Sequence, residues 1–528
     1  MRSTKQLVGI EGREKLLSGI NKMADAVKST LGPMGRNVLI QDEYGNVKTT
    51  KDGVSVAKAL YLQDELENLA ASVLREVSVK TNDVAGDGTT TAMVLAQAII
   101  KSAFHYINDK SLNAIDCKRG IDYEVEQICS YIDSIKKPIT LSDEFVLESV
   151  ASISTNNDPV LGKMLAQAFI AVGESGRVTV HEGKSVDTYF QKNEGISFSR
   201  GYTSSSFINN MKNRSCEFNE GCYILLVGEK ITDIDSFFNF LQISQNREVK
   251  SPVLVICEDI DEKIVNLLAI NKLKGIIDVC VIKSPGLNLE RRDLLEDIAI
   301  SVGGKVISST EGYSFQHASI DDYGFAESIK VTDNTTTIIG GAKNAEKFEE
   351  RIDVLKGQIE ATEEQMLKDR ITERIAKLKG GIGIIYAGGS SEFEIAEKID
   401  RIQDGIHAVQ AVLEDGIVPG GGFALLRYRS DYDLTFLKQA ITAPLVQMLI
   451  NSGFHKDNTS NFLDKMKTES IEVGYDIKHN VRVDNMYEHG IIDSAKVVKS
   501  ALRNAGSVAG LFITTEYVIA NSEYKEQY

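Results

Sequence analysis

The sequence predicts a multi-domain protein that combines a mostly helical part with an α/β part. Two observations carry this prediction. Apolar residues recur at helical spacing through about the first 135 residues, and helical character returns after about residue 423. Between about residues 194 and 310, the strand-like runs CYILLV, PVLVIC, VCVIK and KVIS alternate with helical stretches. That alternation is typical of a parallel sheet covered by helices.

Length and composition limit the classes of protein to consider. The chain has 528 residues, and its 75 Asp and Glu against 59 Lys and Arg give a net charge of −16. A chain this acidic, without basic blocks, is unsuited to general binding of nucleic acid or anionic membranes. It starts without a secretory signal and has no apolar run near the ~18 residues of a membrane helix, so we expect a cytoplasmic protein. Its six cysteines form no CxxC pair and are expected to be buried apolar side chains.

The first elements in the chain are a helix and a hairpin, each followed by a glycine-containing loop. An amphipathic helix is predicted up to Val27 and ends at the loop TLGPMGRN, residues 30–37. The runs NVLIQ and VKTT predict a β-hairpin that leads directly into Lys51-Asp52-Gly53. Each loop is either a simple terminator or a place where exposed backbone amides face a nucleotide.

The run DVAGDGTTT, residues 83–91, opens a helix that is apolar on nearly every side. Its glycines allow a tight turn, and its threonines occupy a helix start with free amides and a positive dipole end. Such a start binds anions, and Asp87 can hold the Mg²⁺ that accompanies phosphates. Taken alone, the run is equally typical of an ordinary helix cap, and we favour that interpretation for the run by itself.

The α/β part lacks a dinucleotide motif but contains two unusually apolar helices. No G-x-G-x-x-G follows any of its strands. The predicted helices at 234–241 and 264–270 are apolar over a wider arc than a helix lying on a sheet requires. They are either buried between layers or leave an open apolar groove. Composition slightly favours burial.

Further on, a charged amphipathic stretch covers 342–379, and a helix follows with apolar residues from Ile395 to Leu413. Asp404 lies on the polar face of that helix near Asp400, and taken alone it is a solvated carboxylate. A second glycine loop, PGGG, follows at 419–422, and the closing run GLFITTEYVIA predicts a strand.

Many of these segments together resemble the group I chaperonins, the GroEL class of bacteria and organelles. The resemblance covers nearly the whole chain, in order. It is carried by the segments TLGPMGRNV, TKDGVSVAK, NDVAGDGTTTA, FSRGY, SPG, RRDLLEDIA, DNTTTII, DGIHA, GGGFALLR and SVAGLFITTE.

The resemblance implies three domains. A mostly helical equatorial ATP-binding domain would comprise 1–135 and 415–528, and a small α/β intermediate hinge domain would comprise 136–193 and 383–414. An apical domain, 194–382, would contain a parallel-rich sheet flanked by helices and would bind substrate and co-chaperonin. The family assembles as rings, typically of seven subunits, that enclose non-native protein.

The resemblance also assigns site residues and cofactors. Asp404 and Asp52 would be catalytic, Asp87 would bind Mg²⁺, and K⁺ would lie beside Thr30, Lys51 and Thr90. ATP would contact the remaining matching positions, which are Leu31, Gly32, Pro33, Gly53, Gly88, Thr89, Thr91, Ile153, Ser154, Gly421 and Asp493.

The apical groove of the family receives unfolded polypeptide and then a GroES-like lid co-chaperonin. The matching substrate-binding positions here are Tyr202, Phe207, Phe238, Leu241, Val265, Ala269 and Ile270. Ser206 replaces an aromatic residue and Ala269 a larger aliphatic one, so the groove is expected to be reshaped.

Three departures from the family stand out. The end SEYKEQY replaces a Gly-Gly-Met repeat, the segment between Leu426 and Leu445 is shortened, and Tyr475-Asp476-Ile477 is unlike the family near the adenine. The prediction is an ATP-driven protein-folding ring. The first alternative is a specialised, virus-encoded chaperonin that works as a single ring or without a lid. Less favoured are a small-molecule ATP-dependent enzyme and a holdase that binds without cycling.

Overall fold

The chain folds into two compact units in the computed structural model. The first comprises Met1–Gln167 and Ser391–Tyr528, and the second comprises Ala168–Ser390. The structure describes residues 4–41, 45, 47–110, 113–173, 176–183, 185–193, 195–211, 213–235, 237, 251–286, 289–309, 312–315, 317–341, 345–362, 364–379, 381–429 and 435–521.

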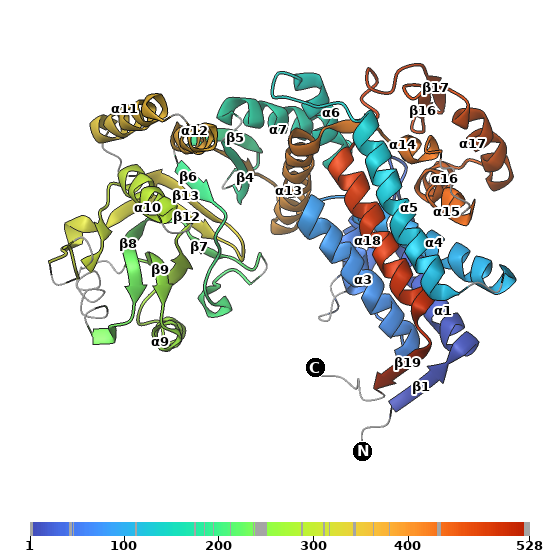
Figure 1. Cartoon of the computed structure of the whole chain (residues 1–528), viewed down its shortest axis with the longest axis horizontal. Helices are drawn as coiled ribbons and strands as arrows, with labels where there is room; N and C mark the ends of the chain where they lie inside the picture. Colours follow the sequence, from blue (N-terminus) through green and yellow to red (C-terminus); the bar gives the residue numbers. More distant parts are fainter. Residues whose placement is uncertain are drawn as a thin grey trace. The chain divides into compact units, whose positions relative to one another are not determined.

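A bundle of long helices forms the centre of the first unit (Figure 1). Helix α18 packs against three others, α3, α4 and α5, and α1 packs against α3 and α4. The bounds of the five helices are α1 (Gly9–Lys28), α3 (Glu65–Ala85), α4 (Thr89–Lys110), α5 (Ala114–Ile135) and α18 (Ala495–Thr514). Helix α4 is buried on most sides, from Ala92 to Ala96 and again at Ile99 and Ile100. This confirms the central position predicted from its apolar sequence, because such a helix must bury its whole circumference.

The first and last described strands of the chain pair with each other in this unit. Strand β1 (Thr4–Val8) pairs antiparallel with β19 (Tyr517–Asn521). The strand predicted from GLFITTEYVIA is therefore only partly right, since α18 continues to Thr514 and only the last residues of the run are extended. The apolar residues at the start of the run, such as Phe512 and Ile513, are buried by helix packing.

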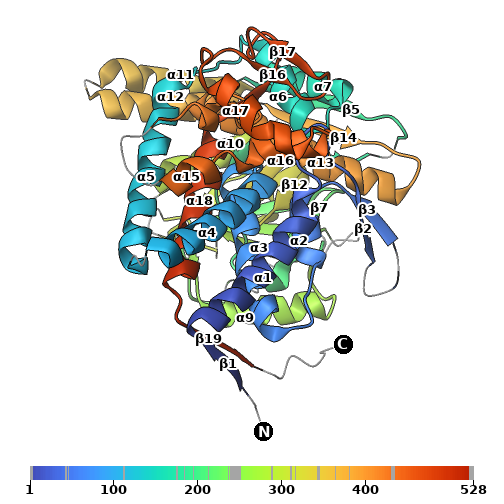
Figure 2. The same cartoon turned by 90° about the vertical axis from the view of Figure 1, so that its right-hand side faces the viewer.

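Shorter elements surround the bundle. Helices α15 and α16 pack against α4 (Figure 2). The remaining elements of the unit are β2 (Val38–Gln41), β3 (Val47–Thr50), α2 (Gly53–Ala59), α6 (Glu144–Ser154), α13 (Glu392–Asp415), β15 (Ile417–Pro419), α14 (Phe423–Leu426), α15 (Thr435–Ala440), α16 (Ala443–Asn451), α17 (Thr459–Lys467), β16 (Gly474–Asp476), β17 (Val481–Val483) and β18 (Ile492–Ser494). The division between the units falls within α7 (Pro159–Val172) and again just before α13.

The second unit is built on an eight-stranded mixed sheet of order β10-β9-β8-β12-β13-β6, with β11 beside β8 and β7 beside β12. The four strands predicted from alternation are present and mutually parallel. They are β8 (Cys222–Ile231), β9 (Val253–Ile260), β10 (Val279–Lys283) and β11 (Val306–Ile307). The rest of the sheet is antiparallel and consists of β6 (Gly195–Phe198), β7 (Cys216–Phe218), β12 (Gly324–Val331) and β13 (Thr336–Gly341).

Helices cover this sheet in layers. Helix α10 (Leu289–Val302) packs on the sheet, and α11 (Ala345–Ala361) and α12 (Gln365–Lys379) pack on α10 (Figure 1). Helix α9 (Glu262–Leu273) lies beside β10. A separate three-stranded sheet joins β4 (Arg177–Glu182), β14 (Ile382–Ala387) and β5 (Tyr189–Asn193).

Both unit boundaries, at 167/168 and 390/391, fall inside the two segments predicted to form an intermediate domain. The three-domain division therefore stays a prediction. Among the described residues, none of the helices is long and apolar enough to cross a membrane. All six cysteines are buried and unbridged, as their sequence context predicted.

Candidate functional site

A cavity of about 520 Å³ lies in the first unit, and residues far apart in the sequence converge on it. Every nucleotide-site residue predicted from the sequence lines this cavity. They are Thr30, Leu31, Gly32, Pro33, Lys51, Asp52, Gly53, Asp87, Gly88, Thr89, Thr90, Thr91, Ile153, Ser154, Asp404, Gly421 and Asp493.

The turn between α3 and α4 forms one wall. Gly86 ends α3 with a φ of 69° and donates its N–H to the carbonyl of Asn82 at 2.7 Å. A Cβ on Gly86 would lie 2.0 Å from Cβ of His407, so only glycine lets α13 pack on this turn. The chain then enters α4 at Thr89, where the first-turn amides lack partners within the helix and can bind an anion.

The loop at 30–37 is fixed by a residue that sequence reasoning did not identify. Asn451, at the end of α16, donates from Nδ2 to the carbonyl oxygens of Lys28 and Leu31, at 3.0 and 2.9 Å. The tight turn is closed by a hydrogen bond from Gly35 N to Gly32 O at 2.9 Å. These contacts hold the loop against the cavity.

Asp52 is the N-cap of α2. Its two carboxylate oxygens accept hydrogen bonds from the backbone N–H groups of Val54 at 3.0 Å and Ser55 at 2.7 Å. Gly53 brings α2 against α4, since a Cβ there would lie 2.1 Å from Oγ1 of Thr90. The carboxylate of Asp52 is therefore held in one orientation beside the start of α4.

Asp87 and Asp404 face the cavity from different helices. Burial raises the pKa of Asp87, and the charge of Asp52 raises it further, although hydrogen bonds from Gly88 N and Ser154 Oγ oppose the shift. Burial raises the pKa of Asp404 well above its ordinary value, with repulsion from Asp87, Asp52 and Asp400 adding to the effect. The three predicted acids thus already interact electrostatically in the nucleotide-free protein.

Asp493 lines the cavity from β18. It accepts hydrogen bonds from the backbone N–H groups of Gly421 and Gly422, but burial and the charge of Asp87 raise its pKa to about 6. The glycine loop is thereby positioned against the cavity.

Several lining residues were not identified from the sequence as ligand contacts. On α13, Glu397, Asp400 and Arg401 line the cavity together with Asp404. Their spacing of i, i+3, i+4 and i+7 marks one helix face and could have revealed them once Asp404 was assigned. The other lining residues outside the predicted set include Asn156, Asn157, Tyr475, Asp476, Ile477, Lys478, His479 and His489.

The charges around the cavity favour a ligand that brings cations. The acidic lining residues are Asp52, Asp87, Glu397, Asp400, Asp404, Asp476 and Asp493, whereas Lys51, Arg401 and Lys478 are the basic ones. A polyphosphate alone would be repelled, and a Mg²⁺ complex would be repelled less because its net negative charge is smaller. Among the described residues, no three His, Cys, Asp or Glu side chains are placed to hold one metal ion together. Mg²⁺ is usually held by one or two carboxylates together with phosphate oxygens and water, and Asp87 supplies one such carboxylate.

The groove predicted on the second unit is only partly exposed. Phe207 is fully buried and Ala269 is 7% exposed, so both belong to the core of the large sheet, whereas Ile270 is 48% exposed. Val265 and Tyr202 are half-buried. Phe238 and Leu241 lie outside the described residues.

Helix α9 contains the second apolar segment, residues 264–270, and its side chains are partly buried and partly exposed. It buries Ile264 and Leu268 but exposes Leu267 and Leu273 together with Ile270. Composition alone favours burial between layers, whereas the family resemblance favours an open groove. For α9 the interpretation of burial is wrong, because one face of the helix is buried and another is exposed. Sequence reasoning did not single out Leu267 and Leu273.

Comparisons with known proteins agree with this architecture. The chaperonin gp146 from the bacteriophage EL 2 (Pseudomonas aeruginosa), crystallised in the presence of ATP-BeFx, matches with a TM-score of 0.71 and 21% identity in one crystal form. The match covers 97% of this chain and 98% of that one. A second crystal form of the same protein matches with a TM-score of 0.64 and 20% identity over the same shares. At this identity the structures support the fold. Residues 23–523 match the TCP-1/cpn60 chaperonin family, and this chain belongs to that family.

Proposed function

We propose that this protein is an ATP-dependent chaperonin that assembles as a homo-oligomeric ring and promotes the folding of non-native polypeptides. The observation that carries the proposal is the convergence of Asp52, Asp87 and Asp404 on one cavity at the start of α4. Two rigid helix ends supply the first two acids, and the long helix α13 supplies the third. This arrangement suits hydrolysis of a triphosphate, which requires a positioned water and neutralised phosphate charge.

Different residues of the cavity are assigned to binding the phosphates, activating the water and holding cations. The amides and hydroxyls of Thr89, Thr90 and Thr91 bind the phosphates, and Asp404 orients the attacking water and accepts its proton. Asp52 assists from the end of α2. Mg²⁺ held by Asp87 would neutralise phosphate charge, with K⁺ beside Thr30, Lys51 and Thr90.

The same charges bear on the protonation of Asp404. Burial and the neighbouring acids favour its protonated form. Cationic charge arriving with the nucleotide opposes that repulsion and favours the ionised carboxylate that hydrolysis needs.

The exposed face of α9 is proposed to bind clients. Leu267, Ile270 and Leu273 present apolar side chains on one helix of the second unit. Unfolded chains expose apolar segments, and such a face captures them by burying area from water. We propose the predicted groove, including Tyr202 and Val265, as the surrounding surface, and a GroES-like lid as a second ligand.

The test combines imaging with a client assay. Negative-stain images should show heptameric rings, as the family resemblance implies, that change shape on addition of ATP. The protein should also suppress aggregation of a chemically denatured client. Ile270→Glu and Leu273→Glu should weaken that suppression. Val354→Glu is the matched control, because Val354 on α11 of the same unit is 52% exposed, close to the 48% of Ile270.

Two results would contradict the proposal. One is a monomer that binds a small metabolite, as expected of a metabolic ATP-dependent enzyme. The other is client capture that ATP does not alter, as expected of a holdase. Images with and without a co-chaperonin also separate double rings from the single-ring or lid-free form that the shortened segment between Leu426 and Leu445 favours.

A further inference from the structure

Helix α13 presents a charged stripe to the cavity, and Arg401 is its only basic member among the described lining residues. Glu397, Asp400, Arg401 and Asp404 follow the spacing i, i+3, i+4 and i+7 and all line the cavity. A helix face serving only to hold Asp404 has no need of a cation one turn away.

Arg401 is paired with Glu397, one turn further from Asp404. Its Nη2 donates to Oε1 of Glu397 at 2.5 Å, with the two side chains 30% and 51% exposed. The pKa of Asp404 is shifted by burial and by Asp87, Asp52 and Asp400. The guanidinium of Arg401 is therefore paired with Glu397 and is not among the charges that shift the pKa of Asp404.

The ion pair between Arg401 and Glu397 can be replaced by a contact between Arg401 and a phosphate group. An exposed i, i+4 ion pair on a helix is weak, because water and salt screen it. A terminal phosphate is a stronger partner than Glu397, since it carries more negative charge than a carboxylate and offers two oxygens to the planar guanidinium, whereas a single nitrogen, Nη2, makes the recorded contact with Glu397. Arg401 also lies three residues from Asp404, on the same helix face, so a phosphate near Asp404 is within reach of its long side chain.

We propose that Arg401 leaves Glu397 for the terminal phosphate of a bound nucleoside triphosphate, and that this contact distinguishes a triphosphate from a diphosphate. The inference rests on the proposed function of the cavity. The other basic lining residues, Lys51 and Lys478, come from the loop before α2 and the turn between β16 and β17. Of the three, Arg401 alone lies on the helix that carries Asp404.

The test measures binding, independently of turnover. Calorimetric titrations of the full chain with Mg²⁺ would use ADP and a non-hydrolysable ATP analogue. Arg401→Gln should weaken analogue binding by about 10- to 100-fold, the range for a lost charged hydrogen bond, and leave ADP binding within about twofold. Glu397→Gln should tighten analogue binding, because it removes the competitor.

Lys398→Gln is the matched control. Lys398 pairs with Glu394 at 3.0 Å in the same i, i+4 geometry on the same helix, and neither residue lines the cavity. The affinities of the Lys398→Gln variant for ADP and for the ATP analogue should match those of the unmodified protein. Arg401→Lys, which keeps the charge without the fork, should bind the analogue more weakly than the unmodified protein and more tightly than Arg401→Gln.

The outcomes separate the inference from the proposed function. Equal weakening of ADP and analogue by Arg401→Gln, or no weakening of either, would overturn the role of Arg401. Failure of the unmodified protein to bind either nucleotide would overturn the proposed function itself.

Discussion

Ser154 Oγ donates a hydrogen bond to Oδ2 of Asp87 at 3.1 Å, joining the end of α6 to the turn before α4. The other carboxylate oxygen, Oδ1, accepts the N–H of Gly88 at 2.5 Å. Each oxygen thus has one protein donor and keeps a free lone pair. This leaves an oriented carboxylate able to bind a cation, and it places the helix that carries Ser154 in direct contact with the site.

Replacing Asp404 by Asn should separate binding from hydrolysis. The amide keeps the size of the side chain but cannot accept a proton, so steady-state phosphate release should fall by about 100-fold or more. Nucleotide affinity should change little, because removing one negative charge near the phosphates does not weaken their binding. Asp464→Asn, at an exposed carboxylate of α17 outside the cavity lining, is the control. Unchanged phosphate release in Asp404→Asn would refute the assigned role.

Asp493 should make the nucleotide-free protein less stable as pH rises. Its pKa is raised from 3.8 to about 6, so the native state binds more protons than the unfolded state between those values. The stabilising contribution is complete below the unfolded pKa and is lost as pH rises through about 6, a loss of at most about 3 kcal/mol.

Asp493→Asn should flatten this part of the pH profile and raise the unfolding temperature at neutral pH. The Asn side-chain oxygen can still accept from Gly421 and Gly422. Calorimetric scans of both proteins at several pH values give the comparison, and a profile with the same slope in the variant would contradict the prediction. Asp87 and Asp404 remain in both proteins, so the difference isolates Asp493.

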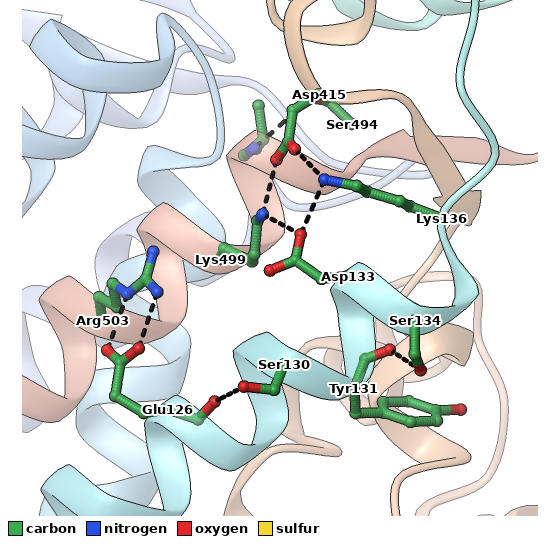
Figure 3. A network of polar contacts seen from close by, with 11 residues as sticks. Glu126, Ser130, Tyr131, Asp133, Ser134, Lys136, Asp415, Ser494, Lys499 and Arg503 are labelled. Carbon is green, nitrogen blue, oxygen red and sulfur yellow. Dashed lines mark hydrogen bonds and ion pairs between the residues drawn. The ribbon is translucent and has the colours of Figure 1, made fainter.

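Lys499, on α18, should stabilise the contact between the end of α5, which carries Asp133, and the end of α13, which carries Asp415. Its Nζ lies 2.6 Å from Asp133 and 2.8 Å from Asp415, and Lys136 contacts the same two carboxylates (Figure 3). Burial raises the pKa of Asp415, but the two lysines hold it below its ordinary value. Beside this network, Lys137 and Ile417 exchange backbone hydrogen bonds of 2.8 and 2.9 Å.

Lys499→Met should therefore lower the unfolding free energy by about 1–3 kcal/mol, because it leaves two carboxylates sharing one cation. Arg503→Met is the matched control on α18, since Arg503 makes a more exposed pair with Glu126 worth about 0–1 kcal/mol (Figure 3). Apparent unfolding temperature and hydrogen exchange at Ile417 are the measurements. Equal effects of the two substitutions would show that the network adds nothing.

The cysteines should resist modification in the folded protein. Burial raises the pKa of Cys117 and Cys129 to about 11 and that of Cys257 to about 12. Cys216 differs, because a hydrogen bond with Cys280 and the nearby Lys272 lower its pKa, yet it is fully buried. Thiol titration at neutral pH should be slow before denaturation and complete after it. Rapid labelling of a native thiol would contradict the buried positions.

Local patterns predicted most of the secondary structure. The strands around CYILLV, PVLVIC and VCVIK are contiguous apolar runs, and their burial on both faces follows from the parallel core of the sheet. The end of α18 was mistaken for a strand because β-branched residues favour strands in isolation. Packing against neighbouring helices outweighed that preference.

The site was predictable only through several segments considered together. Asp404 by itself is an ordinary polar residue on a helix face, and DVAGDGTTT by itself is an ordinary cap. Arg401 and Asn451 went unrecognised because their roles depend on which helix face meets the cavity and on which loop lies beside α16.

Local spacing and motifs in order were enough to predict the family, most of the helices and strands, and the residue types that suit a Mg²⁺–triphosphate complex. Which side chains meet depends on the packing of segments that are remote in the chain. Packing brought Asp52 close enough to raise the pKa of Asp87, and both close enough to raise the pKa of Asp404. It also paired Arg401 with Glu397, and it buried Phe207 while exposing Ile270. The physical reason is that burial and charge interaction depend on distances in space, which packing of remote segments sets.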